Sequence, residues 1–310
     1  MKVLVTCPPM IGLIDEFESM FTVKKIKLDC PPIIQTLSVN ELKNLVPQYD
    51  GWIIGDDPAN YDVLAAGKSG KLKAAVKWGV GIDNVDFMAA KKLGIPLTNT
   101  PQMFGAEVAD IAMGYVIGLA RQTFTIDRGV REGKWLKPSG ISLANKTVAL
   151  IGFGDIGRNT AKRLLAANMK IIAYDPYMQI TSESELVQSA SWPERIEEAD
   201  FIILTCALTS ENKHLLNSDT LAKTKHSVRV VNVARGPLID ETALAEALAS
   251  GKVHSAALDV FEAEPLPINS PLRKYEQCIF GSHNASNTVD SVRRASEKAV
   301  GLLFDFLGVN

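Results

Sequence analysis

Four side chains in the second half of the chain could together carry out a proton transfer. Arg235 follows the apolar run VRVVNV, Asp259 and Glu264 follow SAAL, and His283 follows CIFGS. A guanidinium can hold a carboxylate, an imidazole can give or take a proton near neutral pH, and a neighbouring carboxylate can stabilise the imidazolium. Alone, His283 would more often be a satisfied or surface histidine, so its interpretation depends on the other three.

A glycine pattern in TVALIGFGDIG has the form of a dinucleotide-binding turn. Gly152 would permit the tight turn, Gly154 would let the backbone approach a pyrophosphate, and Gly157 would let a helix pack closely on a strand. The backbone amides around Asp155 and Ile156 would then face the phosphates from a helix N-terminus. An apolar run before the turn and the helical pattern RNTAKRLLAAN after it make the pattern more specific than the glycines alone.

Asp175 ends the next apolar run, KIIAYD, roughly 20 residues past the third glycine, where such folds place a ribose-binding carboxylate. A carboxylate there accepts hydrogen bonds from ribose hydroxyls and repels a 2′-phosphate. No Arg or Lys follows it in DPYMQ. The sequence therefore predicts NAD rather than NADP as the cofactor.

The elements that position these residues alternate between short β-rich runs and helical patterns along the whole chain, which predicts an α/β protein with parallel sheets. Strands are expected in the first third at 2–6, 51–55, 74–79 and 95–100, and in the rest at 146–152, 170–175, 200–205, 228–233, 255–260 and 278–282. The second series predicts a doubly wound sheet of six strands. Its candidate residues should share one crevice, because ligands collect at the carboxyl ends of such strands.

Two helical segments are expected to link the halves. Residues 105–130 carry apolar or small side chains on nearly every face of their first half, which indicates burial in the core or against another subunit. Residues 288–308 repeat apolar residues at helical spacing and should cross back to the first domain. We expect a domain of residues 1–98 completed by 286–310, and a cofactor domain of residues 99–285.

Composition excludes several classes of protein. A chain of 310 residues suggests two domains, and a net charge of -2 with a pI near 6.1 makes nucleic acid an unexpected partner. The cysteines are far apart, and no His, Cys or acidic cluster has ligand spacing, so neither disulfides nor a metal is expected. His214, His226 and His254 are expected to be structural or at the surface. No signal peptide or membrane span is expected, which predicts a cytoplasmic protein.

Five motifs give the chain a specific resemblance. They are GVGIDNVD (79–86), NTP (99–101), GFGDIG (152–157), NVARGPLIDETAL (232–244) and ALDVFEAEPLP (257–267). Over nearly its whole length the chain resembles the D-isomer-specific 2-hydroxyacid dehydrogenases, and most closely their phosphoglycerate-dehydrogenase-like branch. The resemblance implies a Rossmann-type doubly wound domain, a smaller flavodoxin-like α/β substrate domain split across both termini, and a homodimer built through the cofactor domain.

The resemblance also assigns roles to residues. Arg235 would bind the substrate carboxylate and carbonyl, Glu264 would pair with His283, and His283 would move the proton. Backbone amides near Val80 and Gly81 would contact the substrate. Further cofactor contacts, beyond Arg235, His283 and the residues of the glycine turn, would come from Cys206, Val233, Ala234, Asp259 and Ala285.

The resulting interpretation is an NAD-dependent oxidoreductase that interconverts a D-2-hydroxy acid and its 2-keto acid by hydride transfer at C2. Three alternatives remain open at this point. One is an NADH-sensing binding protein of the dehydrogenase-like corepressor type, another is a hydroxypyruvate or glyoxylate reductase, and the third is a formate or phosphonate oxidoreductase on the same scaffold.

Some positions depart from the family pattern. Relatives usually place Pro before the catalytic His and an apolar residue after it, whereas Ser282 and Asn284 stand there in this chain. In LTCALT, Thr205 and Ala207 replace the His and Pro of many relatives. These departures leave the cofactor contact by Cys206 open, and its thiol is expected to act as a small core group rather than a reactive one.

The segment VKWGVGIDN bears on the substrate. In phosphoglycerate dehydrogenases the position of Lys77 is typically a phosphate-binding Arg and the position of Trp78 is small. Lysine keeps the charge without the bidentate fork. We therefore predict a small acidic substrate contacted by Lys77 and Trp78, with a phosphorylated three-carbon acid as the first candidate. The alternative is that Lys77 ends its strand in solvent, while Trp78 and Phe104 pack under the hinge expected between the domains near NTP (99–101).

Overall fold

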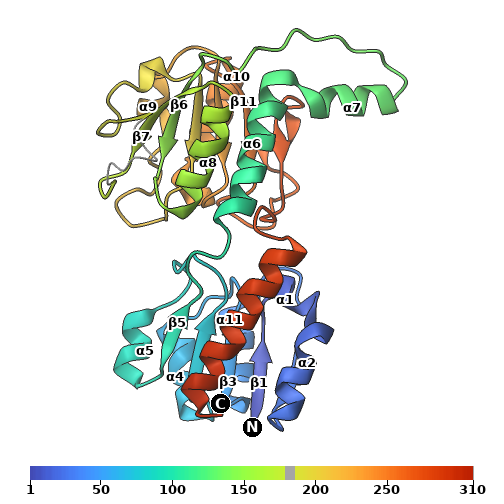
Figure 1. Ribbon diagram of the computed structural model, residues 1–310, viewed down its shortest axis with the longest axis vertical. Coiled ribbons are helices and arrows are strands. Elements are labelled where there is room, and N and C mark those ends of the chain that lie inside the picture. Colours follow the sequence, from blue (N-terminus) through green and yellow to red (C-terminus); the bar gives the residue numbers. More distant parts are fainter. Residues whose placement is uncertain (179–185, 310) are drawn as a thin grey trace. The chain divides into compact units, whose positions relative to one another are not determined.

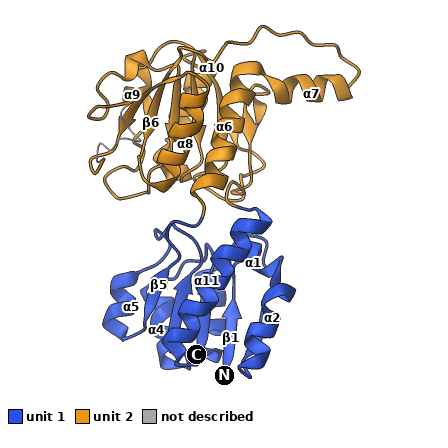
Figure 2. Cartoon of the chain, in the orientation of Figure 1, with its two compact units in different colours: residues 1–103, 287–310 blue, residues 104–286 orange. Residues whose placement is uncertain are grey.

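The chain divides into two units whose boundaries lie near the domain boundaries expected from the sequence. The computed structural model describes residues 1–178 and 186–309; residues 179–185, which include the end of the DPYMQ segment, and residue 310 lie outside this description. Unit 1 comprises Met1–Met103 and Asn287–Asn310, and unit 2 comprises Phe104–Ser286 (Figure 2). The boundaries expected from the sequence were 98/99 and 285/286.

Unit 1 is built on a parallel sheet of five described strands in the order β2-β1-β3-β4-β5, which is the flavodoxin-like order (Figure 1). The strands are β1 (Lys2–Val5), β2 (Lys27–Asp29), β3 (Gly51–Ile54), β4 (Ala74–Lys77) and β5 (Leu97–Asn99). The edge strand β2 was not expected. It has three residues and no fully buried side chain, so it carries no hydrophobic signal.

Helices cover both faces of this sheet. One face carries α1 (Pro8–Ile11), α2 (Ile14–Val23) and α11 (Val289–Leu307), and the other carries α3 (Val39–Leu45), α4 (Tyr61–Ser69) and α5 (Phe87–Leu93). The C-terminal helix α11 packs on β3 and β4, and Phe304 meets Phe21 edge to face at 5.2 Å. Val300 and Leu303 are fully buried. The apolar residues that repeat at helical spacing in this segment therefore pack the C-terminal helix against unit 1.

Unit 2 is built on a parallel sheet of seven described strands in the order β12-β11-β10-β9-β6-β7-β8. The strands are β6 (Thr147–Ile151), β7 (Lys170–Tyr174), β8 (Val187–Ser189), β9 (Phe201–Leu204), β10 (Val228–Asn232), β11 (Val253–Leu258) and β12 (Ile279–Phe280). The order reverses between β6 and β9, as in a doubly wound dinucleotide-binding sheet. The prediction of six strands missed β8, whose three residues show one buried side chain.

The helices α6 (Gly105–Arg121) and α8 (Asp155–Ala166) lie together on one face of this sheet, and α9 (Ser218–Lys223) and α10 (Glu241–Ala249) cover the other. The long helical stretch expected at 105–130 is broken. Gln122 adopts a left-handed φ of 55°, and α7 (Thr123–Arg131) leaves in a new direction, extending from the body of unit 2 in Figure 1. Among the described residues, no helix has the length and apolar character to cross a membrane.

Candidate active site

The glycine turn joins β6 to α8 with almost no space between backbones. Gly152 has a φ of 94°, and a side chain there would fall 2.6 Å from the backbone of Cys206. A side chain at Gly157 would lie 2.2 Å from the Gly152 carbonyl oxygen. Only glycine fits at these two positions, so the sequence pattern corresponds to a real close approach.

The N-terminus of α8 is open to an anion. Its N-cap, Gly154, supplies no side-chain cap, and a side chain added there would meet no atom within 4 Å. The first-turn amides, around Asp155 and Ile156, therefore have room for a phosphate oxygen, which the partial positive charge of a helix N-terminus favours. These features fit the pyrophosphate of a dinucleotide.

Asp175 stands beside this turn, one residue past β7. Its two carboxylate oxygens accept hydrogen bonds from the backbone N–H of Phe153 at 2.6 Å and of Tyr177 at 2.8 Å. The carboxylate is thus fixed next to the glycine turn. This is the position from which a carboxylate meets the ribose hydroxyls of NAD in such folds.

The contribution of Thr205 to the turn was not recognised from the sequence. Its hydroxyl lies 2.8 Å from the Gly152 carbonyl oxygen and 3.1 Å from that of Ile151, so it ties the end of β9 to the glycine turn. A hydroxyl directly after a buried strand next to the turn was the available signal. The neighbouring Cys206 is half-buried, and burial raises the pKa of its thiol to about 11, which keeps it protonated at neutral pH.

His283 and Glu264 form a close pair. Nδ1 of His283 lies 2.7 Å from Oε2 of Glu264, while Oε1 of Glu264 accepts the backbone N–H of Phe261 at 2.9 Å. Both side chains stay accessible, at 23% and 21% exposure. Because Glu264 is anchored by its second oxygen, it holds the imidazole in one orientation and can stabilise the imidazolium.

Asp259 lies beneath the turn that presents His283, and it is almost fully buried. Its backbone carbonyl accepts the N–H of His283 at 2.7 Å, and its carboxylate oxygens accept the N–H of Asn284 at 3.3 Å and of Ala285 at 2.8 Å. These bonds hold His283 at a φ of 55°, a left-handed conformation that is uncommon for a non-glycine residue. Asp259 therefore shapes the histidine turn from below.

Arg235 follows β10, two strands from β12 and one from β11. Its Nη1 donates to the Ala234 carbonyl at 2.8 Å, and Asn232 Nδ2 donates to the Arg235 carbonyl at 2.9 Å. Val233 and Ala234 are buried in the connection between the strand and Arg235. The sheet order thus places the groups after β10, β11 and β12 at one edge, as the strand alternation predicted.

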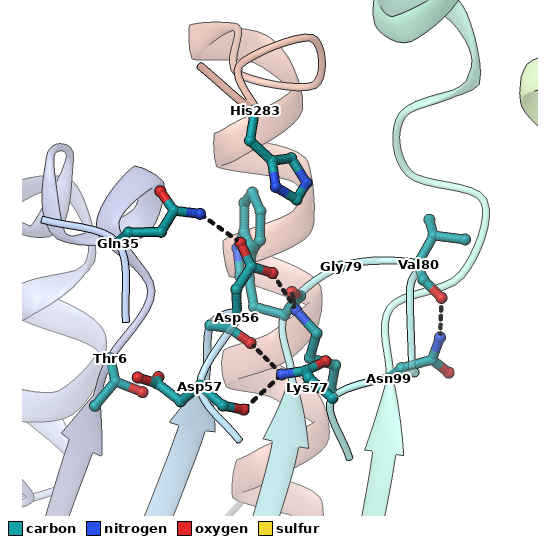
Figure 3. A network of polar contacts seen from close by, with 12 residues as sticks. Thr6, Gln35, Asp56, Asp57, Lys77, Gly79, Val80, Asn99 and His283 are labelled. Atoms are coloured by element: carbon teal, nitrogen blue, oxygen red, sulfur yellow. Dashed lines mark hydrogen bonds and ion pairs between the residues drawn. The ribbon is translucent and has the colours of Figure 1, made fainter. Parts of the chain in front are cut away.

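The substrate-binding candidates of unit 1 lie at the end of β4 (Figure 3). Lys77 and Trp78 are both buried, whereas Val80 is exposed. The Lys77 Nζ contacts Asp56 Oδ1 at 3.2 Å and the Trp78 carbonyl at 2.9 Å. The Trp78 indole N–H donates to Ser296 Oγ at 3.0 Å. The alternative in which Lys77 ends its strand in solvent is wrong, because the strand end is enclosed.

The other histidines have local partners. His214 Nε2 lies 2.5 Å from Glu262 Oε1, His226 Nδ1 lies 3.0 Å from Ser227 Oγ, and His254 Nδ1 lies 2.9 Å from Ser255 Oγ. No group of three or more His, Cys, Asp or Glu side chains in the described part of the chain is arranged to hold a metal ion.

A doubly wound parallel sheet with this glycine turn, a carboxylate after the next strand and a His–Glu pair at the same sheet edge defines a class: dinucleotide-dependent oxidoreductases. The model of the D-isomer specific 2-hydroxyacid dehydrogenase family, NAD binding domain, matches residues 113–285. The chain belongs to this family, and its cofactor is NAD.

Individual proteins that are similar to this chain are also dehydrogenases or reductases. The hydroxypyruvate reductase of Thermotoga maritima is 39% identical over 279 residues, which cover 88% of this chain and 90% of that protein. The D-3-phosphoglycerate dehydrogenase of Methanocaldococcus jannaschii is 39% identical over 234 residues, 74% of this chain and 44% of that protein. A solved glyoxylate reductase from Paecilomyes thermophila is 27% identical with a TM-score of 0.82, covering 97% of this chain and 93% of that one.

These findings confirm the main interpretation of the sequence. The chain is an NAD-dependent oxidoreductase that interconverts a D-2-hydroxy acid and its 2-keto acid. The two protein relatives are named as a reductase and a dehydrogenase, so the enzyme interpretation holds over the NADH-sensing alternative.

Proposed function

We propose that His283 is the acid–base catalyst of this reaction and that Glu264 fixes its orientation and charge. The observation that carries the proposal is the contact of 2.7 Å between Nδ1 of His283 and Oε2 of Glu264. Since Glu264 engages Nδ1, the proton exchanged with the substrate oxygen is the one on Nε2. Asp259 supports this arrangement through its bonds to the histidine turn.

In the direction of reduction, Arg235 binds and orients the keto-acid carboxylate and carbonyl, while the backbone amides of Val80 and Gly81 give further contacts. NADH, when bound, would supply the hydride to C2 and leave as NAD+. His283 then donates its Nε2 proton to the substrate oxygen as negative charge develops there, and Glu264 stabilises the imidazolium beforehand. In this assignment unit 1 is the substrate domain and unit 2 is the cofactor domain, with contacts to NAD from Cys206, Val233, Ala234 and Ala285.

A homodimer in the cytoplasm is part of the proposal. The outer faces of α6 and α7 and the segment after them expose large apolar side chains, namely Ile111, Ile117, Phe124, Val130 and Trp135. Trp135 alone is 79% exposed, and several exposed apolar side chains on these neighbouring segments suit contact with a second copy of the chain. The four free cysteines are consistent with a reducing compartment. Light scattering of the purified protein would measure its mass.

The proposed chemistry is tested by following NADH oxidation with a panel of 2-keto acids: glyoxylate, hydroxypyruvate, pyruvate and 3-phosphohydroxypyruvate. We expect turnover of at least one of them, lost on replacing His283 and retained on replacing the exposed His226. Equal losses in the two variants would contradict the assignment of His283.

A further inference from the structure

Two Asp–Lys pairs join the same two strands of unit 1 at opposite ends. At the amino ends of β3 and β4, Lys73 Nζ lies 2.8 Å from Asp50 Oδ1. At the carboxyl ends, Lys77 Nζ lies 3.2 Å from Asp56 Oδ1. The lysine side chain is 60% exposed in the first pair and 3% exposed in the second. The second pair is therefore enclosed on its cationic side.

The ammonium group of Lys77 binds acceptors within unit 1. Besides Asp56, its ammonium group donates to the Trp78 carbonyl oxygen at 2.9 Å. The other oxygen of Asp56 accepts Gln35 Nε2 at 3.2 Å, so Gln35 and Lys77 converge on one carboxylate (Figure 3). Asp56 is the more exposed member of the pair, at 38%. An incoming ligand thus meets the carboxylate before it meets the ammonium.

The cluster has no positive charge to offer a phosphate. Asp56 matches the charge of Lys77, and the adjoining Asp57, fully buried with Oδ1 accepting the Leu37 N–H at 2.8 Å, can only add negative charge. Phosphate sites in proteins instead direct uncompensated Arg, Lys or backbone N–H donors at the oxygens.

Lys77 also positions the loop that carries the proposed substrate amides. Its ammonium group binds the carbonyl of Trp78, the first residue of the loop. The N–H of the next residue, Gly79, donates to Thr100 Oγ1 at 2.8 Å. Asn99 Nδ2 donates to the carbonyl of Val80 at 3.1 Å. Three side chains therefore fix three successive residues of this loop. The cluster is therefore bonded to the start of the loop that carries the amides of Val80 and Gly81.

We propose that Asp56 is a specificity residue that excludes a second negative charge on the substrate. The keto acid of this enzyme then carries only its own carboxylate and a short uncharged group beyond the carbonyl, as in glyoxylate or hydroxypyruvate, and 3-phosphohydroxypyruvate is rejected. The proposal rests on the proposed function in one respect, that the Val80–Gly81 loop holds the substrate. It replaces the phosphate contact by Lys77 that the sequence suggested.

The unmodified protein gives the first test, which needs no variant to fold. We expect kcat/KM with NADH to be at least about 100-fold higher for hydroxypyruvate than for 3-phosphohydroxypyruvate. The reason is that bringing two like charges together lowers the affinity of a ligand by orders of magnitude. Equal or better turnover of the phosphorylated acid would overturn the exclusion while leaving the proposed function intact. Turnover of no keto acid in the panel would contradict the proposed function, and the inference would fall with it.

The second test removes the negative charge of Asp56. Asp56→Asn should raise the ratio of kcat/KM for the phosphorylated over the unphosphorylated acid by roughly 10-fold or more, because it removes the exposed negative charge of the cluster. Asp56→Glu keeps the charge and should leave the ratio near its original value. Asp50→Asn makes the same change at the opposite end of the two strands and is the matched control. Thermal melts report whether each variant is folded, and a folded Asp56→Asn protein with an unchanged ratio would overturn the role of Asp56.

Discussion

The two units each place a charged pair at the carboxyl end of a parallel sheet, but only the pair in unit 1 has one member enclosed. In unit 2, His283 and Glu264 are similarly accessible, so the imidazole can exchange a proton with a ligand. In unit 1, Lys77 is enclosed and Asp56 is the exposed partner. The sheet edge alone therefore does not define the chemistry. Which group of a pair remains accessible decides whether the pair transfers a proton or shapes the charge that a ligand meets.

The largest effect is expected when the His283–Glu264 pair is broken. His283→Ala should lower kcat by roughly 10² to 10⁴, the usual contribution of a positioned acid–base group, while NADH binding, measured by its fluorescence, is largely retained. His226→Ala is the control, because His226 is an exposed histidine bonded only to the adjacent Ser227 in the described contacts. Near-normal turnover by the His283 variant would return this residue to a structural role.

A second prediction asks whether a carboxylate in unit 2 repels phosphate as Asp56 is proposed to do in unit 1. Asp175→Ala should narrow the preference for NAD over NADP by about 10- to 100-fold, because it removes both the ribose acceptor and the charge facing a 2′-phosphate. The measurement is kcat/KM for each cofactor. A wild-type enzyme equally efficient with NADP would refute this role for Asp175.

The enclosed pair should matter more for stability than its exposed counterpart. Lys77→Met removes the enclosed cation beside Asp56 and Asp57 and should lower the free energy of unfolding by about 2 to 3 kcal/mol, somewhat less than for a fully buried pair because Asp56 is partly exposed. Lys73→Met breaks the exposed pair and should cost less than about 1 kcal/mol. Urea denaturation measures both, and equal losses would remove the distinction between the two pairs.

Glu264→Gln tests how the carboxylate supports the proton donor. Without the negative charge beside it, the imidazolium is less stable, so the alkaline fall of the reduction rate should move to lower pH. Glu262→Gln, two residues away and paired with His214, should leave the profile in place. A profile unchanged by Glu264→Gln, with chemistry shown to limit the rate, would remove Glu264 from this role.

The smallest expected effect concerns Asp57. Burial, followed by the neighbouring Asp56, raises the pKa of this carboxyl above its ordinary value of 3.8. The native state then binds more protons than the unfolded state just above that value, so the stabilising contribution of Asp57 falls as pH rises through the window. Asp57→Asn should therefore increase the free energy of unfolding at pH 7, with a gain that shrinks towards pH 4. A gain independent of pH would exclude titration of Asp57 as the cause.

The sequence was most informative where a residue type is required by geometry. Gly152 and Gly157 occupy positions where a side chain would collide with neighbouring backbone, so the glycine turn and its strand and helix could be predicted. The alternation of apolar runs predicted the long central strands. It missed β2 and β8 because three-residue edge strands bury too little to leave a pattern.

The sequence by itself determined the α/β class and the NAD turn, and it predicted Arg235, Glu264 and His283 as the candidate set, because these depend on local residue types and on which residues follow apolar strands. Only the tertiary structure decided which charges are compensated. Asp56 lies 21 residues before Lys77 in the chain, and the two meet because β3 and β4 are neighbouring parallel strands. A lysine that looks available for phosphate in the sequence is thereby enclosed, since burial and partnership are set by strand pairing rather than by sequence distance.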